Sequence, residues 1–126
     1  MKLYTFLVVG ALLAIAISCK TATPKGVTAV SLEELDDVLL IEDIQLIDVR
    51  TPIETEDGII TNAKNISYDS EFSTKLSGLD KTKPIIVYCK SGGRSAKASK
   101  ILLEQGFVEI YDLKGGYDNY KKNKVQ

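Results

Sequence analysis

The chain has 126 residues, enough for one domain once any targeting segment is removed, and its apolar and charged contents are those of a globular protein. A net charge of −1 provides no basic field for nucleic acid. The sequence contains no histidine, which excludes Cys–His and Ser–His catalysis and any histidine-ligated metal site. We expect neither a metal nor a cofactor.

The first 18 residues have the pattern of a bacterial secretory signal. Met1 and Lys2 give a positive start, and an uncharged, mostly apolar run follows as far as Ser18. This run is shorter than the roughly 20 apolar residues that a membrane-spanning helix needs. Cys19 follows directly, an order that resembles a lipoprotein signal, in which Cys19 becomes the lipid-modified first residue of the mature chain. A plain signal peptide and an uncleaved anchor are the alternatives.

Cleavage before Cys19 divides the chain into a signal peptide at 1–18, a lipidated tether at 19–27 and a domain at 28–126. The tether is small and polar, with one proline and one glycine. Acyl chains on Cys19 are expected to hold the domain on a membrane of the bacterial cell envelope, facing the periplasm. They would also leave Cys89 as the one thiol of the mature protein.

Strand and helix patterns alternate through the domain. Short apolar runs predict strands at 28–30, 44–49, 65–68, 85–88 and 108–113. Helical patterns lie between them, from Ser31 (which has capping-box spacing to Glu34), at 53–57, at 69–77, from about Ser95 to Gln105, and from Tyr117 onward. This alternation predicts an α/β fold with a small parallel sheet of four to five strands and helices on both faces.

The stretch 84–105 carries the candidate chemistry. An apolar run predicts a buried strand that ends at Cys89, and a Gly-rich loop and a helix follow. A thiol in this place faces loop N–H groups and the positive end of a helix dipole, which favour the thiolate. Adjacent glycines let the backbone curl so that these N–H groups point inward. They belong to Ser91, Gly92, Gly93, Arg94 and Ser95. The alternative is a buried structural cysteine.

Arg94 is the second candidate catalytic residue, because it closes the loop and can hold an anionic group of a substrate or stabilise the thiolate. The alternative is a solvated charge at a helix start. Lys90 is a candidate for substrate binding, together with Ser91, Gly92, Gly93 and Ser95. Lys97 and Lys100 either add to the attraction of a small anion or face solvent.

Charged residues also follow other strands. Asp48, Arg50 and Glu54 lie at the end of the strand at 44–49, where carboxylates commonly cap turns, so we expect structural support from all three. Arg50 and Glu54 can form an ion pair, and Asp48 can accept N–H groups from a neighbouring loop. Lys114 lies at the carboxyl end of the last strand, where parallel sheets place ligands, and is a candidate for the pocket rim.

Three blocks of sequence resemble the single-domain rhodaneses, a family of thiosulfate sulfurtransferases. They are LIDVRTPIE at 46–54, the stretch 57–67, and the stretch 85–120 that holds YCKSGGRS and YDLKGGY. The resemblance implies a rhodanese-like fold and an enzyme in which Cys89 takes a sulfane sulfur, as from thiosulfate, and holds it as a persulfide. A thiol or cyanide then removes the sulfur. A protein is another possible acceptor.

Two other functions stay open. The domain can be a sulfur carrier or persulfide-binding module that loads once without turnover. It can also be a small phosphatase or arsenate reductase with a similar loop. Loops that resemble those of tyrosine phosphatases have one residue more between the cysteine and the arginine. The four residues between Cys89 and Arg94 suit a sulfur atom better than a tetrahedral phosphate.

Overall fold

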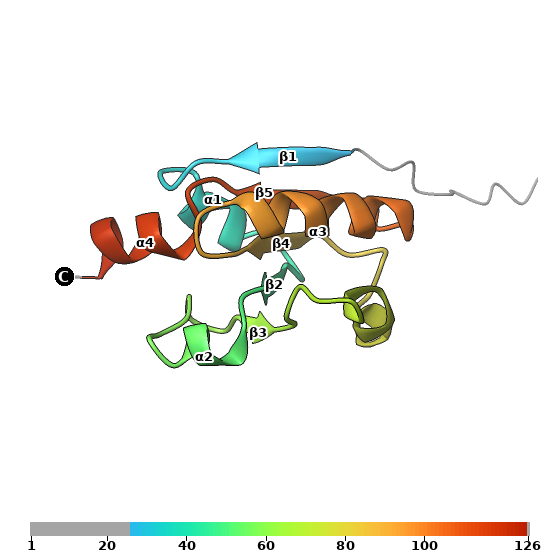
Figure 1. Cartoon of the computed structure of the whole chain (residues 1–126). Coiled ribbons are helices and arrows are strands. Elements are labelled where there is room, and N and C mark those ends of the chain that lie inside the picture. Colours follow the sequence, from blue (N-terminus) through green and yellow to red (C-terminus); the bar gives the residue numbers. More distant parts are fainter. Residues whose placement is uncertain (1–25, 126) are drawn as a thin grey trace, which may run out of the picture.

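A computed structural model describes residues 26–125, which form one five-stranded sheet with helices packed on it. The strands are β1 (Val27–Val30), β2 (Gln45–Asp48), β3 (Lys64–Asn65), β4 (Ile85–Tyr88) and β5 (Ile110–Leu113). Their order is β1-β5-β4-β2-β3, and every neighbouring pair is parallel (Figure 1). The predicted signal peptide, Cys19 and most of the tether lie outside the described residues.

Helices cover both faces of this sheet, as predicted. They are α1 (Leu35–Leu39), α2 (Pro52–Thr55), the 3-10 helix η1 (Phe72–Gly78), α3 (Gly93–Glu104) and α4 (Gly116–Lys124). In Figure 1, α3 crosses the near face of the sheet and α1 lies beyond it. The α/β class and the parallel sheet are therefore confirmed. Within residues 26–125, no helix is both long enough and apolar enough to cross a bilayer.

The core has two apolar layers that share β4. On one face, Val87 packs in a cluster with Leu102 of α3 and Phe72 of η1. On the other face, Ile86 packs in a cluster with Leu35 of α1 and further apolar residues. Successive side chains of a strand point to opposite faces. A strand covered on both sides therefore reads as a continuous apolar run, which explains why β4 contains no polar alternation.

Several elements differ in extent from the sequence-based expectation. The capping box forms, since the Ser31 N–H donates to Oε2 of Glu34 at 2.9 Å, but regular α-helix spans only α1. The helix expected at 69–77 is the 3-10 helix η1, in which the Thr74 hydroxyl donates to a backbone carbonyl. The helix expected from Ser95 begins two residues earlier, because Gly92 adopts a positive φ of 119° and acts as its N-cap.

The start of α4 is attached to the loop after β4. The Tyr117 N–H donates to the Cys89 carbonyl at 2.8 Å, and the Asp118 N–H donates to the Lys90 carbonyl at 3.0 Å. Gly116 makes this approach possible, because a Cβ there would lie 2.5 Å from the Cys89 oxygen and 2.6 Å from the Lys90 oxygen. Its φ of 58° is also in the left-handed region. The backbone of α4 therefore holds the cysteine loop from behind.

We expect Gly116→Ala to destabilise the domain by at least about 1 kcal/mol more than Gly106→Ala, measured by urea unfolding. Both glycines have positive φ, but within residues 26–125 no atom beyond its chain neighbours lies within 4 Å of a Cβ at Gly106. The φ of 92° at Gly106 is further from the left-handed minimum than the 58° at Gly116, so any extra loss at Gly116 reports the steric cost. Equal losses of stability would contradict the close approach of α4 to the loop.

Candidate active site

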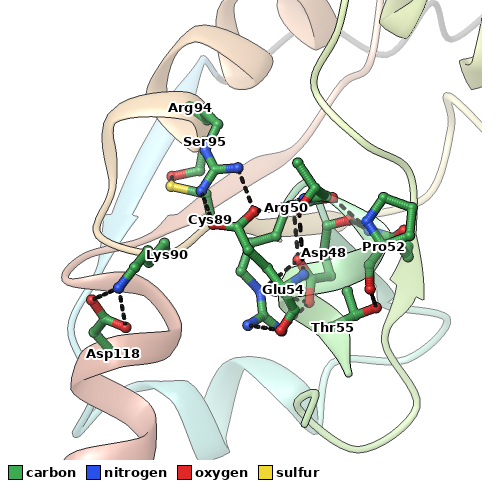
Figure 2. Close-up of polar contacts among 12 residues, drawn as sticks. Asp48, Arg50, Pro52, Glu54, Thr55, Cys89, Lys90, Arg94, Ser95 and Asp118 are labelled. Atoms are coloured by element: carbon green, nitrogen blue, oxygen red, sulfur yellow. Dashed lines mark hydrogen bonds and ion pairs between the residues drawn. The ribbon is translucent and has the colours of Figure 1, made fainter. Parts of the chain in front are cut away.

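The candidate site lies where parallel strands end at one edge of the sheet. Cys89 follows β4 directly, and Asp48 ends β2 in register with Tyr88. Asp112 of β5 pairs in register with Val87 of β4. Because all strands run the same way, these positions gather at a single edge. Figure 2 shows Cys89, Arg94, Glu54, Asp48 and Arg50 drawn close together there.

The Cys89 sulfur lies inside the loop rather than on the surface. Its residue is only 1% exposed, and it is the free cysteine within residues 26–125. The Gly92 N–H donates to Sγ at 3.1 Å. Burial opposes ionisation, but the N–H groups of Ser95, Gly92 and Ser91, with the Ser95 hydroxyl, bring the pKa of the Cys89 thiol below its ordinary value. The loop thus makes the Cys89 thiol easier to ionise than an ordinary cysteine.

The inward-facing N–H groups are a subset of those expected from the sequence. Ser91, Gly92 and Ser95 act on the sulfur, whereas Gly93 and Arg94 open the first turn of α3. The helix starts at this point and its N–H groups have no partner within its own first turn. The sulfur therefore lies at the N-terminal end of a twelve-residue helix.

Arg94 connects α3 to α2 through a two-pronged ion pair. Its Nη1 donates to Oε2 of Glu54 and its Nη2 to Oε1, each at 2.7 Å (Figure 2). Glu54 also accepts the Thr51 N–H at 2.8 Å as part of a capping box at the start of α2. The Arg94 guanidinium and the bonds from Thr51 hold the pKa of Glu54 at about 2. Arg94 is therefore held at the edge of the loop by a carboxylate.

The expected ion pair between Arg50 and Glu54 does not form. Arg50 instead pairs with Asp48, with 2.6 Å between Nη2 and Oδ2, and its Nη1 reaches only the Glu54 carbonyl oxygen, at 3.1 Å. Asp48 and Arg50 are separated by one position in extended chain, so their side chains point to the same face. Asp48 also accepts the Arg50 N–H, from its own loop rather than a neighbouring one.

The lysines around the loop differ in their surroundings. Lys90 is exposed and pairs with Asp118 of α4 at 2.9 Å (Figure 2). Lys114 pairs with Asp112 at 3.2 Å. Lys97 and Lys100 lie on the exposed side of α3, which agrees with the interpretation that they face solvent. The lysines that follow β4 and β5, Lys90 and Lys114, are thus each paired with a carboxylate.

Two acidic residues of the site escaped the sequence analysis. In the sequence Asp118 resembles an ordinary surface carboxylate, and only the position of α4 beside the loop brings it to the site. Asp112 is only 2% exposed and accepts the Ser95 hydroxyl at 2.7 Å. A signal for Asp112 exists, since it lies two residues after the buried Ile110 in a mostly apolar strand and so points to the same face. A charge at a core-facing strand position needs a partner.

A polar hollow of about 220 Å³ opens beside the loop. Its lining carries both signs of charge and one aromatic ring, from Arg50, Glu54, Asp57, Lys90, Tyr117 and Asp118. A hollow with this lining can admit a small charged molecule or the end of a polar side chain. It also lies on the side where parallel α/β sheets place their ligands.

The fold and the cysteine loop define a small α/β domain with an activated thiol. The chain matches the family named Rhodanese-like domain over residues 31–123, and it belongs to that family. It is 41% identical over 81 residues to the thiosulfate sulfurtransferase GlpE of Coxiella burnetii. This match covers 63% of this chain and 73% of that protein.

Two further similarities agree with this assignment. The uncharacterized protein YqhL of Bacillus subtilis is 41% identical over 76 residues, a match that spans 60% of this chain and only 60% of YqhL. The crystal structure of a rhodanese-related protein from Thermoplasma volcanium superposes with a TM-score of 0.68 at 30% identity, covering 78% of this chain and 94% of that one.

We expect Glu54→Gln to reduce the free energy of unfolding at pH 7 by about 1 kcal/mol, since the pair is partly exposed. The pKa of Glu54 is lowered from 4.5 to about 2. The contribution is therefore complete above pH 4.5 and is lost as the pH falls toward 2. Urea unfolding at several pH values measures this. The exposed Glu56→Gln is the control, and a Glu54→Gln deficit that persists at pH 2 would contradict the pair.

Proposed function

We propose that this protein is a sulfurtransferase that moves a sulfane sulfur from a donor such as thiosulfate, through a persulfide on Cys89, to a thiol or cyanide. The observation that carries the proposal is the Cys89 sulfur inside a loop that donates N–H groups to it. Membership of the rhodanese-like family supports it, as does the similarity to a protein named thiosulfate sulfurtransferase.

The first half-reaction follows from a thiolate next to backbone donors. The Cys89 thiolate attacks the outer sulfur of thiosulfate, a new S–S bond forms, and the old S–S bond breaks so that sulfite leaves with its electron pair. The persulfide anion that remains lies near the N–H groups of Gly92, Ser91 and Ser95. Preorganised donors of this kind stabilise charge without reorganisation.

The second half-reaction regenerates the enzyme. An acceptor thiolate or cyanide attacks the outer sulfur of the persulfide, and the Cys89 thiolate leaves. The same N–H groups then receive the negative charge, so one loop serves both steps. Arg94 and Lys90 lie at the mouth of the loop and are the candidates to attract the anionic end of a donor.

A sulfur carrier that hands its sulfur to a partner protein is the second candidate, and a specific observation favours a partner larger than thiosulfate. Arg94 and Lys90 are already paired with Glu54 and Asp118, so a small dianion has to displace a carboxylate from each. A protein or a larger thiol that carries its own charges of both signs meets no such competition. A phosphatase fits less well, because the Arg94 fork is occupied by Glu54 rather than directed at an oxyanion.

We expect protein treated with thiosulfate to gain the mass of one sulfur atom. Cys19→Ser should retain this gain and Cys89→Ser should lose it, as read by intact-mass spectrometry of unlipidated protein. Thiocyanate release with cyanide then separates the candidates, since an enzyme releases many equivalents and a carrier releases one. A sulfur adduct that persists in Cys89→Ser would eliminate both.

We also propose that the protein is a lipoprotein of the bacterial envelope, with acyl chains on Cys19 and the domain in the periplasm. The support is the charge and apolar order of residues 1–18 followed directly by cysteine. Two or three acyl chains anchor a domain without a spanning helix.

Metabolic labelling with a radioactive fatty acid should therefore mark the full-length protein expressed in bacteria, and Cys19→Ser should carry no label. The matched control is Ser18→Ala, which keeps a small residue before the cysteine. Equal labelling of the wild type and Cys19→Ser would eliminate lipidation at this position.

A further inference from the structure

A chain of polar groups leads from the Cys89 sulfur into the protein. The thiol donates to the Ser95 hydroxyl across 3.7 Å, and the Ser95 hydroxyl donates to Oδ1 of Asp112 at 2.7 Å. The other oxygen of Asp112 accepts the Lys114 ammonium at 3.2 Å. The chain thus runs from the end of β4 through the first turn of α3 to β5.

All three inner members of this chain are buried. Cys89 is 1% exposed, Ser95 is not exposed and Asp112 is 2% exposed. The sulfur-transfer steps described above give Asp112 no role. A buried carboxylate costs free energy unless its partners compensate. Ser95 and Lys114 are those partners for Asp112, and the bond from Ser95 also places the carboxylate one hydroxyl away from the nucleophile.

The hydroxyl of Ser95 has a single proton and two acceptor oxygens within hydrogen-bond distance. The Asp112 oxygen is 2.7 Å away, whereas the Gly92 carbonyl oxygen is 3.2 Å away. The shorter, charge-assisted bond is the stronger one. With its proton directed at Asp112, Ser95 presents a lone pair to the sulfur, which is an arrangement that accepts the thiol proton.

We propose that Asp112 takes up the proton of the Cys89 thiol through Ser95 when the thiolate forms, an inference that rests on the proposed function and deepens it. The S–H bond breaks as the proton moves to Oγ of Ser95, and the original Ser95 proton moves to Oδ1 of Asp112. One negative charge moves from the carboxylate to the sulfur. The Ser95 hydroxyl then donates to the thiolate.

This relay provides a proton acceptor for the Cys89 thiol. The chain contains no histidine to act as a base beside the cysteine. The sulfur is buried, and among the described residues Ser95 is the side-chain oxygen bonded to it. When the Cys89 thiolate leaves at the end of the cycle, the same two hops in reverse restore the thiol. Asp112 acts through Ser95 and is a positioning and proton-storing residue.

The surrounding charges are few. Arg94 interacts electrostatically with the thiol, but its guanidinium is paired with Glu54. Lys114 faces the carboxylate from the end of the same strand. The strands on either side place Ala29 and Val87 in register with it, and neither titrates. The pH dependence of thiol reactivity therefore reports chiefly on the relay and on these two cations.

The relay and a purely electrostatic role of Asp112 predict opposite changes in the rate of Cys89 alkylation when the carboxylate is removed. A fixed negative charge near a thiol disfavours the thiolate, so removing that charge by Asp112→Asn should accelerate alkylation. If Asp112 instead accepts the thiol proton, Asp112→Asn keeps the shape and an acceptor oxygen for Ser95 but cannot take the proton. Alkylation should then be slower.

The experiment is the pH profile of Cys89 alkylation by iodoacetamide in full-length protein that carries Cys19→Ser. We expect Asp112→Asn and Ser95→Ala each to slow alkylation at pH 7 by about tenfold or more and to move the midpoint upward by about one unit. The double variant should be no slower than either single variant, because both interrupt one chain.

Ser99→Ala is the matched control, since Ser99 is buried one turn later on the same helix and its hydroxyl has no hydrogen-bond partner among the described residues. Its profile should match the wild type. Circular dichroism and the thermal midpoint establish that each variant is folded, and Ser95→Ala tests the chain independently of Asp112→Asn.

An Asp112→Asn profile that is unchanged or faster would overturn the relay, as would additive losses in the double variant. Alkylation needs no sulfur donor. Failure of the proposed function would therefore appear separately, as a missing sulfur adduct on Cys89 with the alkylation results intact.

Discussion

The buried guanidinium of Arg50 is the interaction on which this edge of the fold depends. It donates to the Asp48 carboxylate and to the carbonyl oxygens of Glu54 and Gly58, and it lies 4.0 Å from the ring centroid of Tyr117. One side chain thereby joins β2, α2, the loop before β3 and α4. A buried charge is tolerated only when it is paired and hydrogen-bonded. Each of these segments therefore provides a partner for the Arg50 guanidinium and is held in place by it. Together the segments support the cysteine loop.

The site recognises charge mainly through the backbone. Arg94 and Lys90 are each held by a carboxylate, from Glu54 and Asp118 respectively, so the rim carries little net charge. The sulfur of Cys89 instead meets N–H dipoles and the start of α3. Such dipoles are fixed in place and need no counter-ion. They suit a charge that appears on sulfur in both halves of a transfer reaction.

Sequence reasoning captured what depends on neighbours along the chain. The buried β4, the cysteine at its end and the glycines after it are local features, and local patterns predicted them. The Glu54–Arg94 pair joins residues 40 positions apart, and the expectation of a nearer partner, Arg50, was wrong. The bond between Asp112 and Ser95 follows only from the packing of α3 on β5, which the sequence does not show. Contacts between distant segments depend on tertiary geometry, which periodicity does not encode.

The strand order has a consequence for how the domain folds. Among the described residues β1 comes first along the chain, but it pairs with β5, the last strand, in a register that joins Val27 to Ile110. The outer strand of the sheet therefore depends on a contact between the two ends of the domain. Pairings between remote segments carry a large loop-closure cost and form late. In this topology the first and the last of the described strands form the outer pair of the sheet together, so neither end of the domain completes that edge alone.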